Sequence, residues 1–526
     1  MNLLTDQLIR TRLTDGEVEI QSLPGVYAAM AQDRITAFPA LRPHQRHAWH
    51  AFLAQLATIA MHRADTSVPP QTSEEWQTLL RGLTPDYTDD EPWCLIVEDP
   101  TRPAFMQCPA LNGLDDYRGR VTTPDDLDVL VTSKNHDVKR AIAQGGAPED
   151  WIFALIDLQT MAGFLGAGNY GIARMNGGFS TRPCLGLAPA KGLVGAHLFH
   201  DVQRMIARRD HLLEDYSNYY APMGGRALLW IEPWSGTEQA DLRTLDPYFI
   251  EICRRVRLRL EGNQFVAWTA SSKSARINAK AAKGNLGDFW TPVENKDSKA
   301  LSLSSVGFPY KRLVELLFEN ETSNKPESMR VEGGTGDQWQ LVARGIAGGQ
   351  GKTEGYHERT DIAFAYKTAS GLFRTAESNR LAEIAKAQIE EISEVTDALR
   401  FGIAIAASGG KEPSDLTRSD RAHATPFVRR LEAVADAQFF SVLQDRFLAE
   451  DGTDAARHRA VFASLLICTA RKLHDEAIDS VPCASIHRHR ARARATSAFE
   501  GRLRRANGVF KDQPEIFNNR ETNNVG

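Results

Sequence analysis

The sequence has few cysteines, no long apolar run and no excess of basic residues, and each absence excludes a class of protein. Only six cysteines occur among 526 residues, and no two of them have CxxC spacing. This scarcity excludes a disulfide scaffold and argues against a cysteine-rich zinc site, because zinc ligands normally come in pairs two to four residues apart. The cysteine content therefore predicts reduced thiols, as in a cytosolic protein.

No part of the chain is apolar enough to cross a membrane or to direct secretion. A membrane helix needs about 18 consecutive apolar residues, and the most apolar central run, residues 141–168, is interrupted by charges and glycines. The N-terminal residues, MNLLTDQLIRTRL, contain both acid and base, and no apolar stretch of signal-peptide length follows them. We therefore expect a soluble, cytoplasmic protein with no membrane partner.

Neither sign of charge dominates the chain. Lys and Arg number 62 and Asp and Glu number 67, which gives a net charge of −5. This balance excludes a uniformly basic nucleic-acid binder, so any binding to a polyanion has to come from local patches. The apolar share of 42% and the charged share of 25% are typical of a soluble globular protein. The length suits two to four domains.

The first 374 residues mix short apolar runs with many glycines and prolines, which favours an irregular α+β domain. Residues 17–27, EVEIQSLPGVY, alternate in polarity and end in Pro24-Gly25, a pattern that predicts a strand followed by a turn. Residues 44–62 have apolar side chains at helical spacing, which predicts a helix. Residues 151–165 also favour a helix, and the Ser-, Ala-, Lys- and Gly-rich segment 270–300 predicts an exposed loop.

From about residue 375 the pattern changes to four consecutive amphipathic helices, which predicts a C-terminal four-helix bundle. The second helix follows Pro426, and the fourth spans about 485–508. The apolar positions of the first helix are Leu381, Ile384, Ala385, Ile389, Ile392, Val395 and Leu399. Those of the third helix are Val461, Leu465 and Cys468. The expected fold class is therefore α+β, with an α+β domain over 1–374, a four-helix bundle over 375–510 and a flexible tail over 511–526.

The segment GIAGGQGKT, Gly345 to Thr353, resembles a phosphate-binding loop without matching it. The pattern GxxxxGK[ST] lets backbone N–H groups surround the phosphates while the lysine binds the outer ones. Its first glycine would have to be residue 346, which is Ile346, and the segment EGYHERTDIAFAY that follows is a poor start for the required helix. We therefore interpret the segment as a flexible finger with Gln350 between glycines.

The segment GAGNYGIARMNGG, Gly166 to Gly178, is unusually rich in glycine. Glycines let a backbone approach another surface closely. The spacing GxGxxG is present, but a dinucleotide site also needs an acidic residue about twenty positions further on, and Ala188, Pro189 and Ala190 lie there. Two interpretations stay open: a structural loop, or a backbone surface that lies against a phosphate chain or a groove.

Two basic segments suit contact with phosphate. VTSKNHDVKRA, Val131 to Ala141, holds a lone histidine with no second ligand cluster, which argues against metal or acid–base chemistry. Residues 486–511 contain eight Lys or Arg and one Glu, a net charge of +7. In a helix, like charges four residues apart repel each other, so an anionic partner is a reasonable expectation, with a plain solvated face as the alternative.

No Ser–His–Asp, Cys–His or paired-carboxylate pattern indicates a catalytic site.

These segments and their order resemble the CasA family, the large subunit of the type I-E CRISPR surveillance complex Cascade. The similarity is clearest at the N-terminus, in MNLLTDQLIRTR, EVEIQSLPGVY, HAWHAFLAQLATIA and PAFMQ. A glycine loop, a Gly-Gly-Gln segment and a helical bundle then follow in the order expected of the family.

The resemblance implies a subunit that binds nucleic acid and catalyses no reaction. Such subunits read the protospacer-adjacent motif, a short duplex beside the target, mainly in the minor groove. They help to open the duplex for guide-RNA pairing and recruit a helicase-nuclease. The implied partners are guide RNA, double-stranded target DNA, and the backbone, small and 5′-handle-binding subunits. No cofactor is implied, and no metal is expected because the cysteine cluster of some relatives is missing.

The family's functional residues, carried over to this sequence, fall into a few groups. Gln350 is the candidate wedge at the first base pair, and Lys352 follows it. The groove lysine is either Lys296 or Lys299. The wedge is framed by Gly348, Gly349 and Gly351, and the groove-reading loop consists of Gly168, Asn169, Tyr170 and Gly171. The loop toward the guide RNA contains Lys134, Asn135 and His136. The basic helix contributes Arg488, Arg490, Arg492 and Arg494.

Two other functions are compatible with the sequence. The first is a P-loop-like nucleotide-binding enzyme that uses Gly345–Thr353, which would lose nucleotide binding in Lys352→Ala. The second is a protein-only scaffold, which would have no affinity for DNA at any salt concentration.

Overall fold

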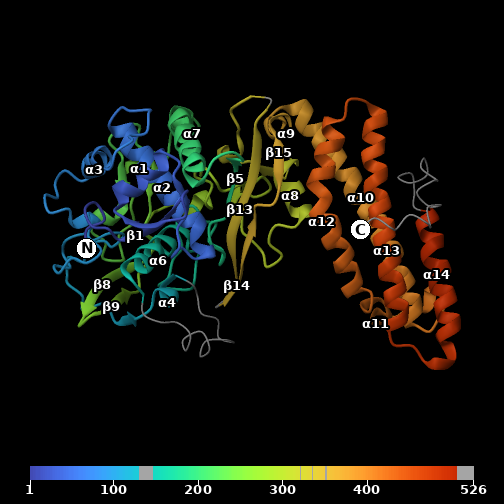
Figure 1. Cartoon of the computed structure of the whole chain (residues 1–526). Helices are drawn as coiled ribbons and strands as arrows, with labels where there is room; N and C mark the ends of the chain where they lie inside the picture. Colours follow the sequence, from blue (N-terminus) through green and yellow to red (C-terminus); the bar gives the residue numbers. More distant parts are fainter. Residues whose placement is uncertain (129–145, 320–321, 335, 350–351, 506–526) are drawn as a thin grey trace. The chain divides into compact units, whose positions relative to one another are not determined.

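The computed structural model describes residues 1–128, 146–319, 322–334, 336–349 and 352–505, and these residues divide into two compact units (Figure 1). The first unit comprises Met1–Phe308 and Asn320–Asp361, and the second comprises Pro309–Glu319 and Ile362–Gly526. The first is a mixed α+β unit and the second is helical, so the predicted α+β fold class is confirmed. The segment Pro309–Glu319 belongs to the second unit, which a change of composition near residue 375 does not indicate.

The helices of the first unit surround one central helix, α2 (Arg46–Arg63). Its side chains are buried on all sides, as expected for a helix in the middle of a core. Helices α6 and α7 pack directly against it. The predicted helices over 44–62 and 151–165 are confirmed. The other helices of this unit are α1 (Leu23–Ala31), α3 (Ser73–Arg81), α4 (Pro124–Asp128), α6 (Pro148–Met161) and α7 (Val194–Asp215).

Several small sheets cover the remaining faces of the first unit. Strand β1 lies between β2 and β3, β9 lies between β4 and β8, and β13 pairs on its two sides with β14 and β5. Two smaller sheets are β11-β10-β12 and the parallel pair β6-β7. The strands are β1 (Ile9–Leu13), β2 (Val18–Gln21), β3 (Ile35–Ala37), β4 (Gly119–Val121), β5 (Cys184–Pro189), β6 (Arg226–Leu228), β7 (Leu245–Ile250), β8 (Arg255–Glu261), β9 (Gln264–Ala270), β10 (Val293–Glu294), β11 (Lys299–Ala300), β12 (Ser323–Asn324), β13 (Gln338–Gly349) and β14 (Lys352–Arg359).

The turn predicted at Pro24-Gly25 is wrong. Strand β2 ends at Gln21, and helix α1 begins at Leu23 with Ser22 as its N-cap. The Ser22 hydroxyl accepts a hydrogen bond from the backbone N–H of Gly25 at 3.3 Å. Proline fits the first turn of a helix because its φ is already helical and the backbone N–H groups there lack partners. The same Pro-Gly pair that punctuates many hairpins therefore starts a helix here.

The exposed loop predicted over 270–300 is also wrong in part. Leu286, Phe289 and Trp290 each have 4% or less of their surface exposed, and they belong to the core of the first unit. Their neighbour Asp288 is buried too and binds two arginines. The many small and charged residues of the segment suggest exposure. The burial of Asp288 was not predictable from them, because its arginine partners come from a distant part of the chain.

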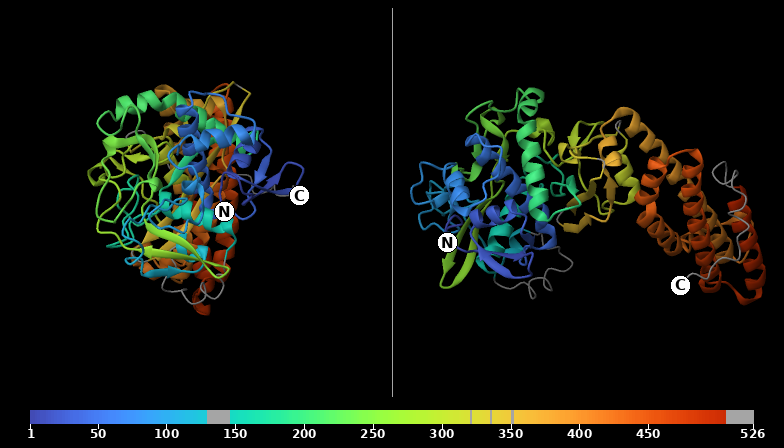
Figure 2. Two further views of the ribbon diagram at one scale, coloured as in Figure 1. Left: turned by 90° about the vertical axis from the view of Figure 1, so that its left-hand side faces the viewer. Right: turned by 45° about the horizontal axis from the view of Figure 1, so that its top comes forward.

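The second unit is built around four long helices that lie side by side (Figures 1 and 2). They are α10 (Thr375–Ala407), α12 (Thr425–Leu448), α13 (Gly452–Ser480) and α14 (Arg488–Arg505). The predicted bundle of four consecutive helices is confirmed. Shorter elements of this unit are α8 (Tyr310–Leu317), β15 (Ala363–Ala365), α9 (Tyr366–Gly371) and α11 (Arg418–Ala422).

One face of the bundle differs from the prediction. On α13 the predicted apolar positions Val461 and Leu465 are 67% and 40% exposed. The buried face lies one position further along, at Phe462, Leu466 and Leu473. The run AVFASLLICTA is apolar around the whole helix, so its spacing does not distinguish the two faces.

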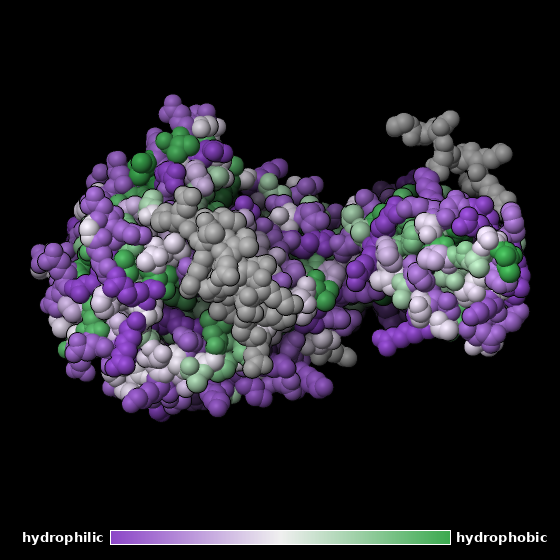
Figure 3. Space-filling view, turned by 90° about the horizontal axis from the view of Figure 1, so that it is seen from below, coloured by the Kyte–Doolittle hydropathy of each residue, from purple (hydrophilic) through white to green (hydrophobic). Residues whose placement is uncertain are grey.

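Short 3-10 helices connect many of these elements. On the face seen in Figure 3, hydrophobic residues form small groups among polar ones. Within the described ranges, no helix has both the length and the apolar character needed to cross a bilayer. The 3-10 helices are Pro43–Gln45, Glu91–Trp93, Leu229–Ile231, Leu242–Thr244, Lys280–Ala282, Glu327–Met329, Pro413–Asp415 and Ser485–His487.

Candidate nucleic-acid interface

The glycine-rich loop connects α6 to β5 and forms a compact turn. The N–H of Leu165 donates to the carbonyl of Asn169 at 3.0 Å, and the N–H of Asn169 donates to the carbonyl of Gly166 at 3.0 Å. Gly166 and Gly168 have φ of +116° and +89°, in the left-handed region that favours glycine. A side chain added at Gly166 would meet no atom within 4 Å. The backbone of this turn is therefore open to a ligand at Gly166.

The loop does not have the geometry of a dinucleotide site. That motif needs a strand before the glycines and a helix directly after them, so that the helix N-terminus faces the pyrophosphate. Here helix α6 ends at Met161 before the glycines, and strand β5 follows them at Cys184. The GxGxxG spacing therefore has no nucleotide-binding meaning in this fold.

Arginine 254 holds the loop from its inner side. Its Nη2 donates to the carbonyl of Gly163 at 3.1 Å, and its Nη1 donates to the carbonyl of Tyr170. A side chain on Gly171 would come within 2.7 Å of the Gly163 carbonyl carbon. Of the predicted groove-reading residues, Tyr170 and Gly171 thus take part in the internal packing of the loop, whereas Asn169 is exposed.

A cleft of about 1230 Å³ lies beside the loop in the first unit. It is larger than most small-molecule pockets, which measure about 300–1,000 Å³. Asn169 lies in its wall, together with five basic and three acidic side chains and a row of Ser and Thr hydroxyls. The charged residues are Arg118, Arg120, Arg254, Arg255 and Lys273, and Asp116, Asp126 and Asp128. Cations and hydroxyls in this arrangement suit the phosphates and sugars of a nucleic acid.

Lysine 273 is a functional candidate that sequence reasoning missed. It follows strand β9, and its backbone N–H donates to the carbonyl of Gly236 at 2.7 Å. The N–H of the preceding Ser272 donates to the carbonyl of Gly168 at 3.1 Å, which ties this segment to the glycine loop. The side chain of Lys273 is exposed, lines the cleft and forms no ion pair with a described residue. Its only signal in the sequence is its position in the segment 270–300, for which the composition predicts an exposed loop.

The two lysines predicted for the groove lie elsewhere in the first unit. Lys299 is in β11, and its Nζ lies 2.8 Å from a carboxylate oxygen of Asp297 and 3.6 Å from one of Glu294. Lys296 is exposed in the turn between β10 and β11. Neither lines the cleft. The geometry therefore favours Lys273 over both as a partner of the glycine loop.

The predicted finger is a β-hairpin made of β13 and β14. Gly349 pairs with Lys352, so the hairpin ends in the two residues Gln350 and Gly351, which lie outside the described part of the chain. The wedge role of Gln350 stays a prediction. The loop Lys134–His136 also lies outside the described residues.

The hairpin rules out the phosphate-binding loop. Such a loop joins a strand to a helix whose N-terminus faces the phosphates. In this protein Lys352 and Thr353 begin strand β14, which runs antiparallel to β13. The NTPase alternative from the sequence is therefore wrong for this segment.

Strand β13 of the hairpin is joined to the end of the glycine loop at Ile346 and Gly348, toward the end where β14 begins. The N–H of Thr181 donates to the carbonyl of Ile346 at 3.0 Å, and the N–H of Ile346 donates to the Thr181 hydroxyl at 2.9 Å. A methyl group on Gly348 would lie 2.1 Å from the carbonyl oxygen of Phe179. The two segments predicted to read and open a duplex are thus parts of one continuous structure.

We expect Gly348→Ala to destabilise the first unit by about 1–3 kcal/mol, because the added methyl group forces the strand away from the Phe179 carbonyl. Urea denaturation of the full-length chain measures this change. Gly334→Ala is the matched control, since a methyl group there would meet no atom within 4 Å. Equal stability of the Gly348 variant and the unmodified chain would show that the close contact is not required.

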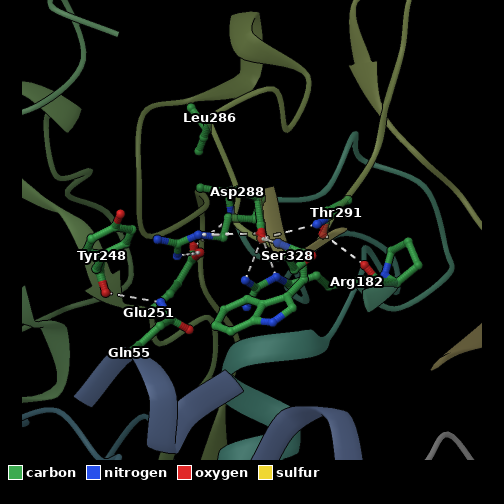
Figure 4. Close-up of polar contacts among 12 residues, drawn as sticks. Gln55, Arg182, Tyr248, Glu251, Leu286, Asp288, Thr291 and Ser328 are labelled. Atoms are coloured by element: carbon green, nitrogen blue, oxygen red, sulfur yellow. Dashed lines mark hydrogen bonds and ion pairs between the residues drawn. The ribbon is translucent and has the colours of Figure 1, made fainter. Parts of the chain in front are cut away.

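A buried ionic network supports the loop on its other side (Figure 4). Asp288 lies at its centre, with one carboxylate oxygen 2.6 Å from Nε of Arg182 and 3.7 Å from Nε of Arg174. Burial would raise the pKa of Asp288, but the two guanidinium groups hold that pKa below its ordinary value. Glu251 accepts from the N–H of Ala173 at 2.7 Å, and burial raises the pKa of Glu251 to about 7. The network fixes residues 173–182 to the 288–290 segment.

The predicted basic helix is α14, and most of its four arginines already have partners within the second unit. Arg490 donates to the carbonyl of Gly409 at 3.1 Å, Arg494 binds Glu412 at 2.6 Å, and Arg492 pairs with Asp479. Arg488 is exposed. These contacts reduce the positive charge that the helix presents to solvent, and its DNA-binding role stays a prediction.

Two clusters in the first unit combine side chains that metals bind. One consists of His50, His197 and Asp201, and the other of His44, Asp128 and Asp157. All six cysteines are free thiols, and neither cluster includes one.

Comparison with known proteins places these features in a family. The family model described as CRISPR-associated protein Cse1 matches residues 2–465. A comparison with curated protein sequences finds no match.

Solved structures with the same fold cover almost the whole chain. Cse1 from Thermobifida fusca is 16% identical with a TM-score of 0.65, and the match covers 96% of this chain and 98% of that one. Cse1 from Acidimicrobium ferrooxidans is 14% identical with a TM-score of 0.63, with coverage of 96% and 98%. CasA (Cse1) from Thermus thermophilus is 13% identical with a TM-score of 0.61, with coverage of 96% and 99%.

Proposed function

Because the chain belongs to the Cse1 (CasA) family, the large subunit of the type I-E CRISPR surveillance complex Cascade, we propose that it reads the protospacer-adjacent motif in double-stranded DNA and helps to open the target. The main support is the juxtaposition of the glycine loop, Lys273 and the cleft, with strand β13 of the hairpin bonded to the end of the same loop.

The open backbone at Gly166 and the exposed Asn169 suit the minor groove. That groove is narrow and presents a degenerate pattern of acceptors, so its readers use close backbone approach and a few polar side chains. Lys273 adds a positive charge beside the loop, which the narrow groove attracts. Arg118 and Arg120 of the cleft wall suit the phosphates on either side.

Opening the duplex is assigned to the hairpin tip. Gln350 offers both donors and acceptors to an unpaired base, and parting one step costs a few kcal/mol of stacking. Guide pairing then carries the sequence information, so the protein needs only to start the separation. In this proposal the chain breaks no bond and recruits the helicase-nuclease that degrades the target.

The remaining contacts follow from the same assignment. The loop Lys134–His136 binds the guide RNA, and the exposed part of α14 binds DNA or a neighbouring subunit.

The test uses the assembled complex with its guide RNA and compares duplex target with target whose strands are already separated. We expect Gln350→Ala to weaken duplex binding about tenfold or more, because the cost of unstacking is no longer compensated. Binding to the separated target stays unchanged. Gln338→Ala, an exposed glutamine at the other end of β13, is the matched control. Equal duplex affinity of the Gln350 variant and the unmodified complex would refute the wedge assignment.

A further inference from the structure

Three metal-binding side chains meet between two helices, away from the glycine loop. His50 comes from α2, and His197 and Asp201 come from one face of α7 at i and i+4. The Nε2 atoms of His50 and His197 lie 2.8 Å and 3.7 Å from the same carboxylate oxygen of Asp201. The two imidazole rings are stacked with centroids 4.1 Å apart. Bonds of about 2.0–2.1 Å to one ion place its donors about 3–4 Å from one another. The distance from His197 lies in this range, and the distance from His50 is that of a hydrogen bond, which a bound ion would replace and lengthen slightly.

The space beside these residues is the size of a single ion or water. A cavity of about 20 Å³ is lined by His50 and His197, and also by His47, Cys184 and Trp290. One water needs about 10–15 Å³ measured in this way. A cavity so small, with three histidines and a thiol in its wall, has no room for an organic ligand.

Two buried side chains of this region have unpartnered polar atoms: His47 lines the cavity, and Asp201 lies next to its lining residues His50 and His197. Asp201 is fully buried, and its Oδ1 has no hydrogen-bond donor among the described residues. His47 is 2% exposed, and both of its ring nitrogens lack a partner in the described part of the chain. Buried polar atoms without a partner are rare and costly, so each one calls for an explanation such as a bound ion.

The surroundings orient the carboxylate. The indole N–H of Trp290 donates to Oδ2 of Asp201 at 2.8 Å. An outer donor of this kind fixes the orientation of a ligating carboxylate in metal sites. Arg344 also lines the cavity, but its guanidinium binds Glu358 at 2.7 Å, which offsets its charge.

We propose that His50, His197 and Asp201 bind a divalent zinc-class ion, with a water in the adjoining cavity as the fourth ligand. Two imidazoles, one carboxylate and a water are donors that zinc accepts, whereas magnesium and calcium prefer oxygen alone. The ion joins α2 to α7 within the core of the first unit. Its role is structural, and it is independent of the proposed DNA contacts.

The test measures zinc and cobalt binding to the full-length chain after its metals are removed with a chelator. We expect one equivalent of zinc, a cobalt spectrum of tetrahedral coordination, and a higher Tm of the stripped chain when zinc is added. His50→Gln and His197→Gln should each weaken zinc binding at least tenfold. His211→Ala, an exposed histidine of the same helix, should bind zinc as the unmodified chain does.

Several results would overturn the proposal. The stripped chain could bind no zinc and give no tetrahedral cobalt spectrum. His197→Gln could bind zinc as tightly as the unmodified chain. Zinc could be lost instead in His44→Gln, which would assign the ion to the other cluster. If the histidine variants fail to fold, the cobalt spectrum of the unmodified chain decides the question: a tetrahedral spectrum supports the site, and its absence refutes it.

Discussion

Replacing Lys273 with alanine is expected to weaken binding of the assembled complex to duplex target by about ten- to a hundredfold. The variant loses a charged contact beside the glycine loop, and one such contact is worth about 1–3 kcal/mol. It should also lower the slope of log affinity against log salt by about 1. Electrophoretic or fluorescence titration at several salt concentrations measures both effects.

Three other variants make this experiment discriminating. Lys296→Ala and Lys299→Ala test the lysines that the sequence favoured, and both should leave duplex affinity within about twofold, because neither side chain lines the cleft. Lys191→Ala removes an exposed lysine elsewhere in the same unit and controls for net charge. If Lys296→Ala lowers the affinity and Lys273→Ala does not, the groove lysine is Lys296 and the cleft is not the binding surface.

Replacing Asp288 with alanine is expected to destabilise the first unit by about 3–5 kcal/mol, because Arg182 would lose its nearest counterion in the core and Arg174 would be left with Glu251 alone, 4.0 Å away. The pKa of Asp288 lies below its ordinary value of 3.8, so its contribution is present above about pH 4 and is lost as the pH falls through the folded-state pKa. Urea denaturation near neutral pH, followed by tryptophan fluorescence, measures the loss.

The matched control for this variant is an exposed ion pair of the same unit. Asp215 binds Arg208 at 2.8 Å, and its side chain is 55% exposed. Asp215→Ala should therefore cost no more than about 1 kcal/mol. A change below about 1 kcal/mol in Asp288→Ala as well would mean that the buried network does not hold the loop.

Local pattern was sufficient for the long helices. Apolar residues recur at helical spacing in residues 44–62 and in the four bundle helices, a pattern that indicates a helix rather than a strand. The structure confirms these helices. Pattern failed where it was ambiguous. The continuous apolar run of α13 hides which face is buried, and Pro24-Gly25 suits both a hairpin and the start of a helix.

The candidate site depends on contacts that no local pattern contains. The glycine loop was visible in the sequence, but its partner Lys273 was not, because a hydrogen bond from Ser272 to Gly168 joins residues 104 positions apart. The burial of Asp288 also depends on contacts with residues far away in the sequence. An aspartate in a segment rich in small and charged residues indicates exposure, and the distant Arg182 makes its burial favourable.

The paired hydrogen bonds between Thr181 and Ile346 join the end of the glycine loop directly to strand β13. A connection of this kind keeps the two segments at a constant separation. Under the proposed function, a duplex bound to the loop would therefore meet β13 at a distance that the protein fixes. A duplex whose helical rise is altered by a mismatch or bulge would fit the two contacts less well, so the geometry of the duplex would be part of what is selected.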